Sequence, residues 1–298
     1  MGAAVVGVHG IAKEQLGMRQ LLDPWTVGLQ DGLEKALGRP IPDPDLAIAF
    51  YGDLFLSAAD EGLGDDRPNL LGQPDPMSAS SLAVTVTVTE RSDDVSDEDL
   101  GFLESAAAEA ELNRPDLGEE MGFIAVPKIL QPLVRHLSRR FDARLVLPFL
   151  SVLRQVRLYQ QDDALAEQIR NRVLSTIGDG CPVLLGHSLG SVVAFETLAL
   201  HPDLAVDTLV TCGSPLSMRT VADGLRGRPG PGRLPGQIRR WVNIYDPADP
   251  VAGAGAVSRL WTQAEDYEVH NGDEPHAIIR YLSKKITGRT IAETGIPH

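Results

Sequence analysis

The Gly-His-Ser-Leu-Gly pentapeptide at residues 186–190 constrains the fold more than any other feature of this sequence. The residues directly before it, 181–185, form a short apolar run that predicts a buried strand. After it, apolar residues recur at helical spacing as far as Leu200. The glycines on either side of Ser188 permit a turn so sharp that larger side chains would collide with the strand or the helix. The segment therefore predicts a strand, a tight turn at Ser188 and a helix.

This context is the one in which Gly-x-Ser-x-Gly acts as a nucleophile elbow. The turn exposes the Ser188 hydroxyl above the sheet, and the N-terminus of the next helix favours negative charge that develops there. A bare match to the motif also occurs at ordinary glycine turns. The predicted flanking strand and helix favour the catalytic interpretation over that alternative.

With these flanks the chain resembles the α/β-hydrolase superfamily, and within it a bacterial lipase/esterase-like branch of serine hydrolases. The resemblance covers residues 4–12, 183–216 and 241–282. It implies a catalytic triad in the chain order serine, acid, histidine, and an oxyanion loop after an early strand. The implied chemistry needs no metal and no organic cofactor.

The oxyanion loop is expected where the first predicted strand, residues 4–8, runs into His9 and Gly10. In the resembling family a His-Gly pair at this point supplies one amide of the oxyanion hole, which implies the N–H of Ile11 as a donor. The N–H of Leu189, directly after the nucleophile, is the second implied donor. We expect His9 to orient this loop and not to act as the base. The alternative is a plain strand-to-loop glycine.

The acid is expected in the loop after the strand predicted at 240–245. The family's acid commonly stands as Asp-x-Val a few residues beyond a late strand, and Asp249, followed by Pro250 and Val251, matches that placement. Asp246 lies closer to the strand end and remains the alternative acid. Either residue could instead shape the turn, because Asp beside Pro often does so.

The base is expected after the last predicted strand, residues 267–269. His276 opens a predicted helix that carries Tyr281, and this resembles the family's pattern of a histidine followed by a helix containing Tyr-Leu. His270 stands too early, nearly on the strand. His276 therefore completes the implied order of serine, acid and histidine.

The alternation of strands and helices predicts an α/β fold with a doubly wound, mostly parallel sheet. Relatives usually have two antiparallel strands before the oxyanion strand, so we expect a sheet trimmed at its N-terminal edge and interpret residues 1–298 as one domain. We expect strands at 4–8, 46–50, 182–186, 208–211, 240–245 and 267–269, and helices at 25–37, 164–177, 188–200 and 277–286.

We interpret residues 53–150 as a largely helical cap inserted over Ser188, because the elements named above are complete without them. The apolar faces of its helices could line a site for an apolar substrate or simply pack on the domain. Within this segment we expect a long loop at 60–76, a strand at 84–89, and helices at 97–112, 126–140 and 145–159.

Composition bounds the other function classes. The chain has 298 residues, enough for one α/β domain with an insertion, and 27 Lys and Arg against 41 Asp and Glu give a net charge of −14. That acidity argues against nucleic acid and anionic membranes as partners. Cys181 and Cys212 lie on predicted core strands and are expected to be small apolar residues, not a disulfide or metal ligands. No apolar stretch reaches the ~20 residues of a membrane span, and no signal peptide is evident, so we expect a cytoplasmic protein without integral membrane association.

These observations favour a serine hydrolase that cleaves a carboxylic ester or thioester of a small, apolar acyl substrate through an acyl-enzyme on Ser188. One alternative is an acyltransferase or cyclase that uses the same triad, since the two differ in which nucleophile reaches the acyl-enzyme. Another is a non-catalytic binding protein on this fold. The intact set of Ser188, Asp249 and His276 argues against the binding protein.

Overall fold

A parallel sheet forms the centre of the protein. The computed structural model describes residues 3–10, 18–55, 96–111, 130–139, 143–230, 233–253 and 255–294. Its six strands all pair in parallel, in the order β2-β1-β3-β4-β5-β6, so the predicted α/β fold is confirmed. The strands are β1 Val5–Val8, β2 Leu46–Ala49, β3 Cys181–His187, β4 Val206–Cys212, β5 Arg240–Tyr245 and β6 Ala264–Glu268.

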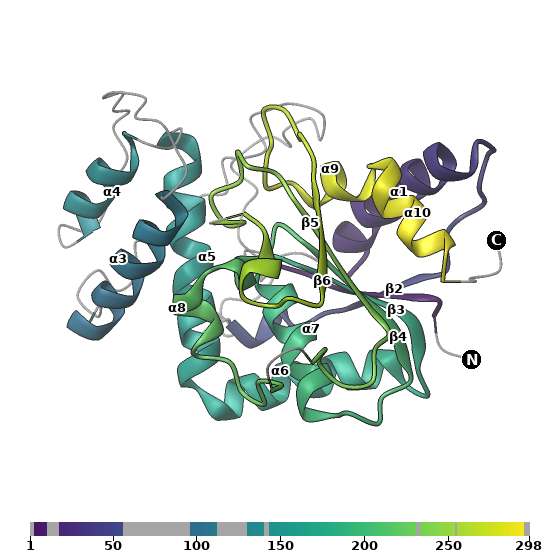
Figure 1. Ribbon diagram of the computed structural model, residues 1–298, viewed down its shortest axis with the longest axis horizontal. Helices are drawn as coiled ribbons and strands as arrows, with labels where there is room; N and C mark the ends of the chain where they lie inside the picture. The colour runs from purple at the N-terminus through teal and green to yellow at the C-terminus, as the bar shows by residue number, and fades with distance from the viewer. Residues whose placement is uncertain are drawn as a thin grey trace, which may run out of the picture.

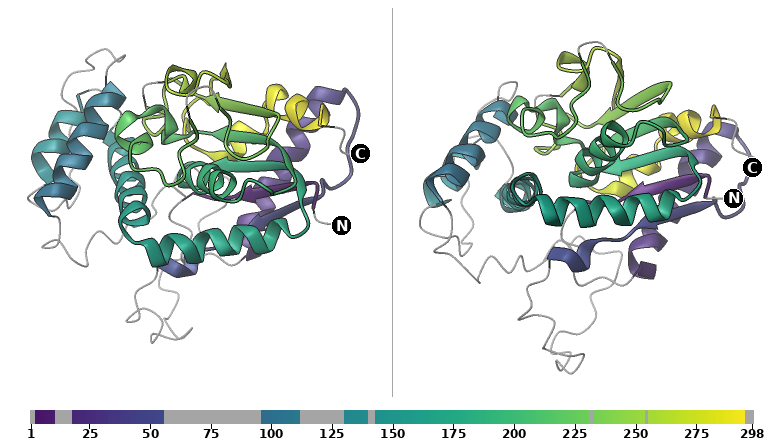
Figure 2. Two further views of the ribbon diagram at one scale, coloured as in Figure 1. Left: turned by 60° about the horizontal axis from the view of Figure 1, so that its bottom comes forward. Right: turned by 90° about the horizontal axis from the view of Figure 1, so that it is seen from below.

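Helices cover both faces of this sheet. Figure 1 shows α1, α9 and α10 together on one face and α6 and α7 on the other, and Figure 2 shows the same layers from two further directions. The helices are α1 Met18–Leu37, α3 Asp97–Glu111, α4 Gln131–Leu137, α5 Ala143–Gln161, α6 Asp163–Ile177, α7 Leu189–Leu200, α8 Arg219–Ala222, α9 Ile278–Leu282 and α10 Lys285–Ala292, with 3-10 turns at η1 Gly52–Phe55, η4 Pro215–Ser217 and η5 Val257–Arg259.

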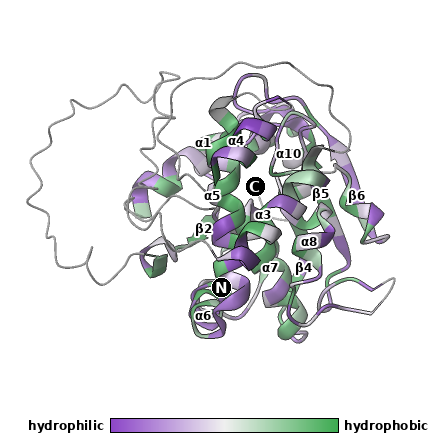
Figure 3. Cartoon of the chain, turned by 90° about the vertical axis from the view of Figure 1, so that its left-hand side faces the viewer, coloured by the Kyte–Doolittle hydropathy of each residue, from purple (hydrophilic) through white to green (hydrophobic). Residues whose placement is uncertain are grey.

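The core follows the period of two along the strands. Val183 packs in one apolar cluster with Trp25 of α1 and Leu282 of α9. Its neighbour Leu184 points to the opposite face and joins a second cluster, to which Phe195 of α7 belongs. Because helices bury both faces, β3 is a continuous apolar run, and α7 is hydrophobic along most of its length (Figure 3).

Two helices differ from their predicted bounds. α1 is described from Met18 on, ahead of the predicted start at residue 25, and it continues through Pro24. Burial of Leu21 in the core stabilises this first part and outweighs the hydrogen bond that a proline removes. The helix predicted at 277–286 is two helices, α9 and α10. The hydroxyl of Thr287 caps α9 by donating to the carbonyl oxygen of Tyr281 at 2.6 Å, so the chain can turn between them.

The described part of the inserted segment lies at the end of the sheet to which the strands point. Figure 1 shows α3 and α4 beyond the C-terminal ends of the strands. Glu109 of α3 caps α8, because its carboxylate accepts from the backbone N–H groups of Arg219 and Thr220 at 2.5 and 2.8 Å. The loop and strand predicted at 60–76 and 84–89 lie outside the described residues. The cap assignment for residues 53–150 stays a prediction.

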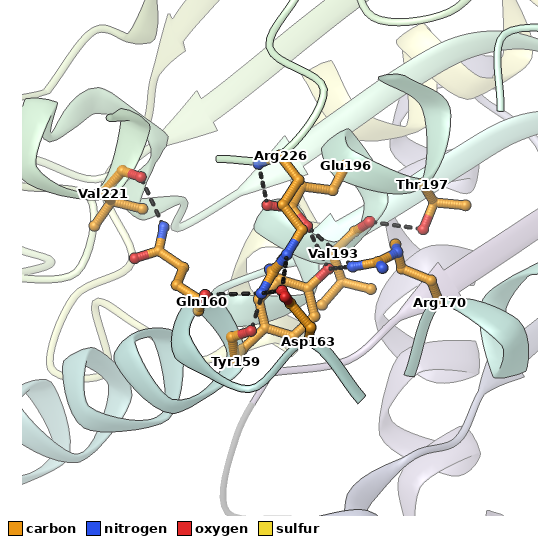
Figure 4. Close-up of polar contacts among 9 residues, drawn as sticks. All are labelled: Tyr159, Gln160, Asp163, Arg170, Val193, Glu196, Thr197, Val221 and Arg226. Carbon is orange, nitrogen blue, oxygen red and sulfur yellow. Dashed lines mark hydrogen bonds and ion pairs between the residues drawn. The ribbon is translucent and has the colours of Figure 1, made fainter. Parts of the chain in front are cut away.

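A buried charge network fastens α7 to the corner between α5 and α6 (Figure 4). Glu196 of α7 is fully buried, and its Oε2 accepts from the hydroxyl of Tyr159 at 2.8 Å and from Nη1 of Arg170 at 3.3 Å. Oε1 accepts from the backbone N–H of Arg226 at 2.7 Å. The Arg226 guanidinium also donates to Asp163 at the start of α6. These contacts balance the buried charge and fix the helix that follows Ser188.

Candidate active site

The turn between β3 and α7 is sharp and strained. Ser188 has φ 56° and ψ −129°, and among the described residues it is the one non-glycine with positive φ. A Cβ on Gly190 would lie 2.0 Å from the carbonyl oxygen of Val8, and one on Gly186 would lie 2.5 Å from Cα of Ser191. Both glycines are therefore required by close backbone contact. Positive φ at such a residue costs about 1–3 kcal/mol, and strain of this kind is concentrated at functional sites.

Hydrogen bonds hold the backbone of Ser188 in this conformation. Its carbonyl oxygen accepts from the backbone N–H of Ser191 at 2.9 Å and from the Ser191 hydroxyl at 2.6 Å. Its N–H donates to the carbonyl oxygen of Cys212 in β4 at 3.1 Å. The Ser191 hydroxyl is itself 2.7 Å from the hydroxyl of Ser214. The predicted strand, turn and helix are confirmed, and the turn is fixed on both sides of Ser188.

The sheet topology places Ser188 at a switch point. β1 lies between β2 and β3, so the chain leaves β1 toward one side and returns through β3 on the other. In open α/β sheets, ligands bind in the crevice outside the carboxyl ends of two such strands. Ser188 follows β3 and Gly10 follows β1, and a Cβ on Gly10 would lie 2.8 Å from Cβ of Ser188. The topology therefore places Ser188 where ligands bind in sheets of this kind.

Asp249 and His276 form a hydrogen-bonded pair. Nδ1 of His276 lies 2.8 Å from Oδ2 of Asp249, and the side chains are 24% and 0% exposed, respectively. The other oxygen, Oδ1, accepts from the backbone N–H of Val251 at 2.9 Å. A carboxylate on Nδ1 fixes the tautomer with the proton on that atom, which leaves Nε2 as the nitrogen that can accept a proton.

His276 lies directly beside the turn at Ser188. Nε2 of His187 donates to the carbonyl oxygen of His276 at 2.9 Å, and the centroids of the two rings are 4.7 Å apart. A Cβ on Gly213, which follows the β4 residue bonded to Ser188, would lie 3.1 Å from Nδ1 of His276. The structure thus places His276 against His187, the residue before Ser188, and against Gly213, which follows the β4 residue bonded to Ser188.

Ser188 and His276 are not hydrogen-bonded in this structure. Oγ of Ser188 is buried, and within the described ranges it has no hydrogen-bond partner. Catalytic hydrogen bonds in ligand-free enzymes are often long and tighten only when substrate binds. The structure therefore does not show the Ser188–His276 hydrogen bond that a catalytic triad implies.

Asp246, the alternative acid, has a different set of partners. Its Oδ1 accepts from the backbone N–H of Ala248 at 2.7 Å, and its Oδ2 from the backbone N–H of Asn271 at 2.5 Å. The side-chain amide of Asn271 in turn donates to the carbonyl oxygen of Pro275 at 2.9 Å, one residue before His276. Asp246 therefore links the loop after β5 to the loop that carries His276, while Asp249 contacts the imidazole.

Of the two predicted oxyanion donors, the structure describes Leu189 but not Ile11. Leu189 is the first residue of α7, so its N–H has no acceptor within the helix, and the residue is fully buried beside Ser188. Ile11 lies outside the described residues. His9 is buried, and its Nε2 accepts from the backbone N–H of Tyr51 at 3.2 Å, so Nδ1 carries the proton and donates to the carbonyl oxygen of Gly10 at 2.6 Å. These contacts match the loop-orienting role that we expected for His9.

Tyr281 contacts both aspartates of this loop, a link that the sequence does not predict. Its buried hydroxyl donates to Oδ2 of Asp249 at 2.8 Å and accepts from the backbone N–H of Asp246 at 3.1 Å. Burial, together with the Asp249 charge, raises the pKa of Tyr281 well above its ordinary value. The position of Tyr281 five residues after His276 is visible in the sequence, but no spacing rule links a helical tyrosine to an acid 32 residues upstream.

The described residues offer no metal site. Within the described residues, no group of three or more His, Cys, Asp and Glu side chains could hold a metal ion. Cys181 and Cys212 are free and buried, and burial raises the pKa of the Cys181 thiol to about 12 and that of Cys212 still further. Among the helices that the structure describes, none is long and apolar enough to cross a membrane.

Comparisons with known proteins do not identify a family. No protein-family model matches the chain, and no curated protein matches it. Among solved structures, the C-terminal domain of glucosamine-fructose-6-phosphate aminotransferase from Francisella tularensis aligns at 10% identity over 98% of this chain and 84% of that chain, with a TM-score of 0.21. A TM-score this low carries no argument about fold or function. The geometry around Ser188 therefore carries the functional argument.

Proposed function

We propose that this protein is a serine hydrolase of the α/β-hydrolase superfamily, similar to lipases and esterases, that cleaves a carboxylic ester or thioester. The observation that carries the proposal is the strained turn at Ser188 beside the His276 ring, which is hydrogen-bonded to the buried Asp249. A structural turn has no need of positive φ at a serine, because glycine adopts that conformation at little cost. A binding protein has no need of an imidazole oriented by a buried carboxylate.

The proposed reaction follows from these groups. Oγ of Ser188 attacks the substrate carbonyl while Nε2 of His276 accepts its proton, and Asp249 stabilises the imidazolium that forms. The N–H of Leu189 and that of Ile11 donate to the developing oxyanion, each contributing roughly 3 kcal/mol to the transition state. The bond between the carbonyl carbon and the leaving oxygen or sulfur breaks, and His276 returns its proton to the leaving group. Water then attacks the acyl-enzyme by the reverse sequence and releases the acid.

A fluorophosphonate probe tests this proposal. We expect the purified protein to form one covalent adduct, located at Ser188 by peptide mass spectrometry, because the probe reacts with serines activated by a neighbouring base. Ser188→Ala should abolish labelling and lower turnover of an ester by about 10⁴-fold or more. Ser175→Ala, which removes an exposed hydroxyl on α6, is the matched control and should leave labelling unchanged. An adduct on another serine, or none at all, contradicts the proposal.

A panel of p-nitrophenyl esters of increasing acyl length separates the remaining possibilities. Hydrolysis that is faster for longer, uncharged acyl groups supports the apolar substrate class. The same panel with added alcohols or amines tests for acyl transfer: release of p-nitrophenol without free acid would identify a transferase on the same triad. Adduct formation with no turnover of any ester would leave the reaction step of the proposal unsupported.

A further inference from the structure

We propose that Tyr281 is a positioning residue for the acid: its buried hydroxyl binds the same oxygen of Asp249 that accepts from His276, and it thereby sets the orientation of the carboxylate and the basicity of the histidine. The inference rests on the proposed function, in which Asp249 and His276 are the acid and the base.

The contacts fix Tyr281 in one role. Its hydroxyl accepts from the backbone N–H of Asp246 at 3.1 Å, so its own proton is directed to Oδ2 of Asp249, 2.8 Å away. Nδ1 of His276 reaches the same Oδ2 at 2.8 Å. Val251 occupies Oδ1 through its backbone N–H at 2.9 Å. The carboxylate is thus held by three donors: the His276 ring, the Tyr281 hydroxyl and the backbone N–H of Val251.

The hydroxyl remains a donor throughout any practical pH range. Burial and the adjacent Asp249 carboxylate raise the pKa of Tyr281 well above its ordinary value. Besides the base, the titratable groups that face Tyr281 are the carboxyls of Asp246 and Asp249, His187 with its ring centroid 6.2 Å away, and the thiol of Cys212. Burial raises the pKa of the Cys212 thiol, so that group stays neutral.

Two lysines, Lys284 and Lys35, lie near the end of α9. Lys284 follows α9, and burial lowers its pKa, while the nearby Asp246 carboxylate opposes that shift. Lys35 of α1 donates to the carbonyl oxygen of Ser283 at the end of α9. The NMR signals of the His276 ring isolate the imidazole from both ammonium groups.

The expected effect of the hydroxyl has a definite sign. By donating to Oδ2 it draws negative charge away from the oxygen that faces the imidazole. Without it, more negative charge faces His276, and the protonated imidazolium becomes more favourable. Tyr281→Phe should therefore move the acidic limb of the pH profile of kcat/KM to higher pH by about half to one unit. The loss of one anchor on the carboxylate should also lower kcat by roughly threefold to tenfold.

The experiment measures this limb and, separately, the pH midpoint of the His276 ring signals by NMR, assigned with a His276→Asn variant. Tyr159→Phe is the matched control: it removes the hydroxyl of another buried tyrosine that donates to a buried carboxylate, that of Glu196 (Figure 4). The control should lose stability without moving either midpoint. A Tyr281→Phe protein that loses stability and kcat, while both midpoints stay in place, would reduce Tyr281 to packing and overturn the proposal.

A second variant covers the case in which Tyr281→Phe does not fold. Site-specific 3-fluorotyrosine at position 281 keeps the hydroxyl and makes it a stronger donor, so both midpoints should move to lower pH. A midpoint that does not move, or moves upward, overturns the proposal. The NMR titration needs no turnover, so it remains informative if Ser188 is not labelled by the fluorophosphonate. In that event the proposed function fails while the Tyr281–Asp249–His276 coupling is still measured.

Discussion

Nδ1 of His276 lies 2.8 Å from Oδ2 of Asp249, although 27 residues separate the two in the chain. The loop that carries Asp249 follows β5, and the loop that carries His276 follows β6. Because these two strands are adjacent and parallel, both side chains lie at the same edge of the sheet. β3 delivers Ser188 to this edge as well. Parallel strands all end on one side, which is how residues so far apart in sequence come to share a site.

Replacing Asp249 should lower kcat more than replacing Asp246. Asp249→Asn removes the carboxylate that orients the imidazole, so we expect kcat to fall by about 10³–10⁴-fold. Asp246→Asn turns an amide toward the backbone N–H of Asn271 and should loosen the base loop, with a larger effect on thermal stability and a smaller one on kcat. Steady-state kinetics and thermal unfolding of both variants test this. The reverse order of kcat effects would identify Asp246 as the acid.

Gly213 should be required for activity for two reasons: its positive φ and the close approach of Asp249 to its Cα. It has φ 53°, and a Cβ there would lie 2.8 Å from Oδ2 of Asp249. Gly178 has φ 58° with open space around it, so it is a matched control for the strain alone. Gly213→Ala and Gly178→Ala should each lose about 1–2 kcal/mol of stability. Only Gly213→Ala should lower kcat, by roughly 10²-fold, because it displaces the acid. Equal kcat in the two variants would contradict this account.

The protein should lose stability in alkaline solution. Burial raises the pKa of the Cys181 thiol to about 12 and that of Cys212 further, whereas unfolded thiols ionise near ~8.5. Above that pH the unfolded chain binds fewer protons than the native protein, so the free energy of unfolding falls as pH rises. Each thiol contributes up to about 1.4 kcal/mol per pH unit until its folded pKa is reached. Tyr51 and Tyr281, whose pKa values are also raised, add to the decline above about pH 10.

Urea unfolding at pH 7.5, 8.5, 9.5 and 10.5 measures this slope. Cys212→Ala should show a shallower decline than the unmodified protein, because one of the two thiols is gone. A free energy of unfolding that stays constant from pH 8 to 10 would show that the thiols ionise equally in both states.

The buried network around Glu196 should contribute far more to stability than an exposed ion pair. Glu196→Ala leaves the Arg170 guanidinium buried without its carboxylate, and we expect a loss of about 3–5 kcal/mol. Arg172→Ala breaks an ion pair with Asp53 whose side chains are 47% and 40% exposed, and should cost less than about 1 kcal/mol. Chemical denaturation of both variants gives the comparison, and equal losses would show that the network is not energetically special.

The sequence by itself determined the elements and the order of the candidate residues. Apolar runs such as 181–185 predict buried strands because parallel strands are covered on both faces, and the glycines around Ser188 predict the turn because only they fit the close backbone contacts. These signals are local, so they are visible within a few residues of chain. The same locality explains why the sequence did not predict that α1 runs through Pro24 or that the chain breaks between α9 and α10, since both depend on packing and capping by distant residues.

Only the tertiary structure decided between Asp246 and Asp249 as the partner of the His276 ring, since both are aspartates beside proline in the same loop and sequence gives no distance to a ring 27 or more residues away. It also revealed the contact of Tyr281 with Asp249, because the phenol reaches that carboxylate only once the fold brings α9 beside the loop that follows β5. Hydrogen bonds act over about 3 Å, and the folding of six parallel strands sets which groups come within that range.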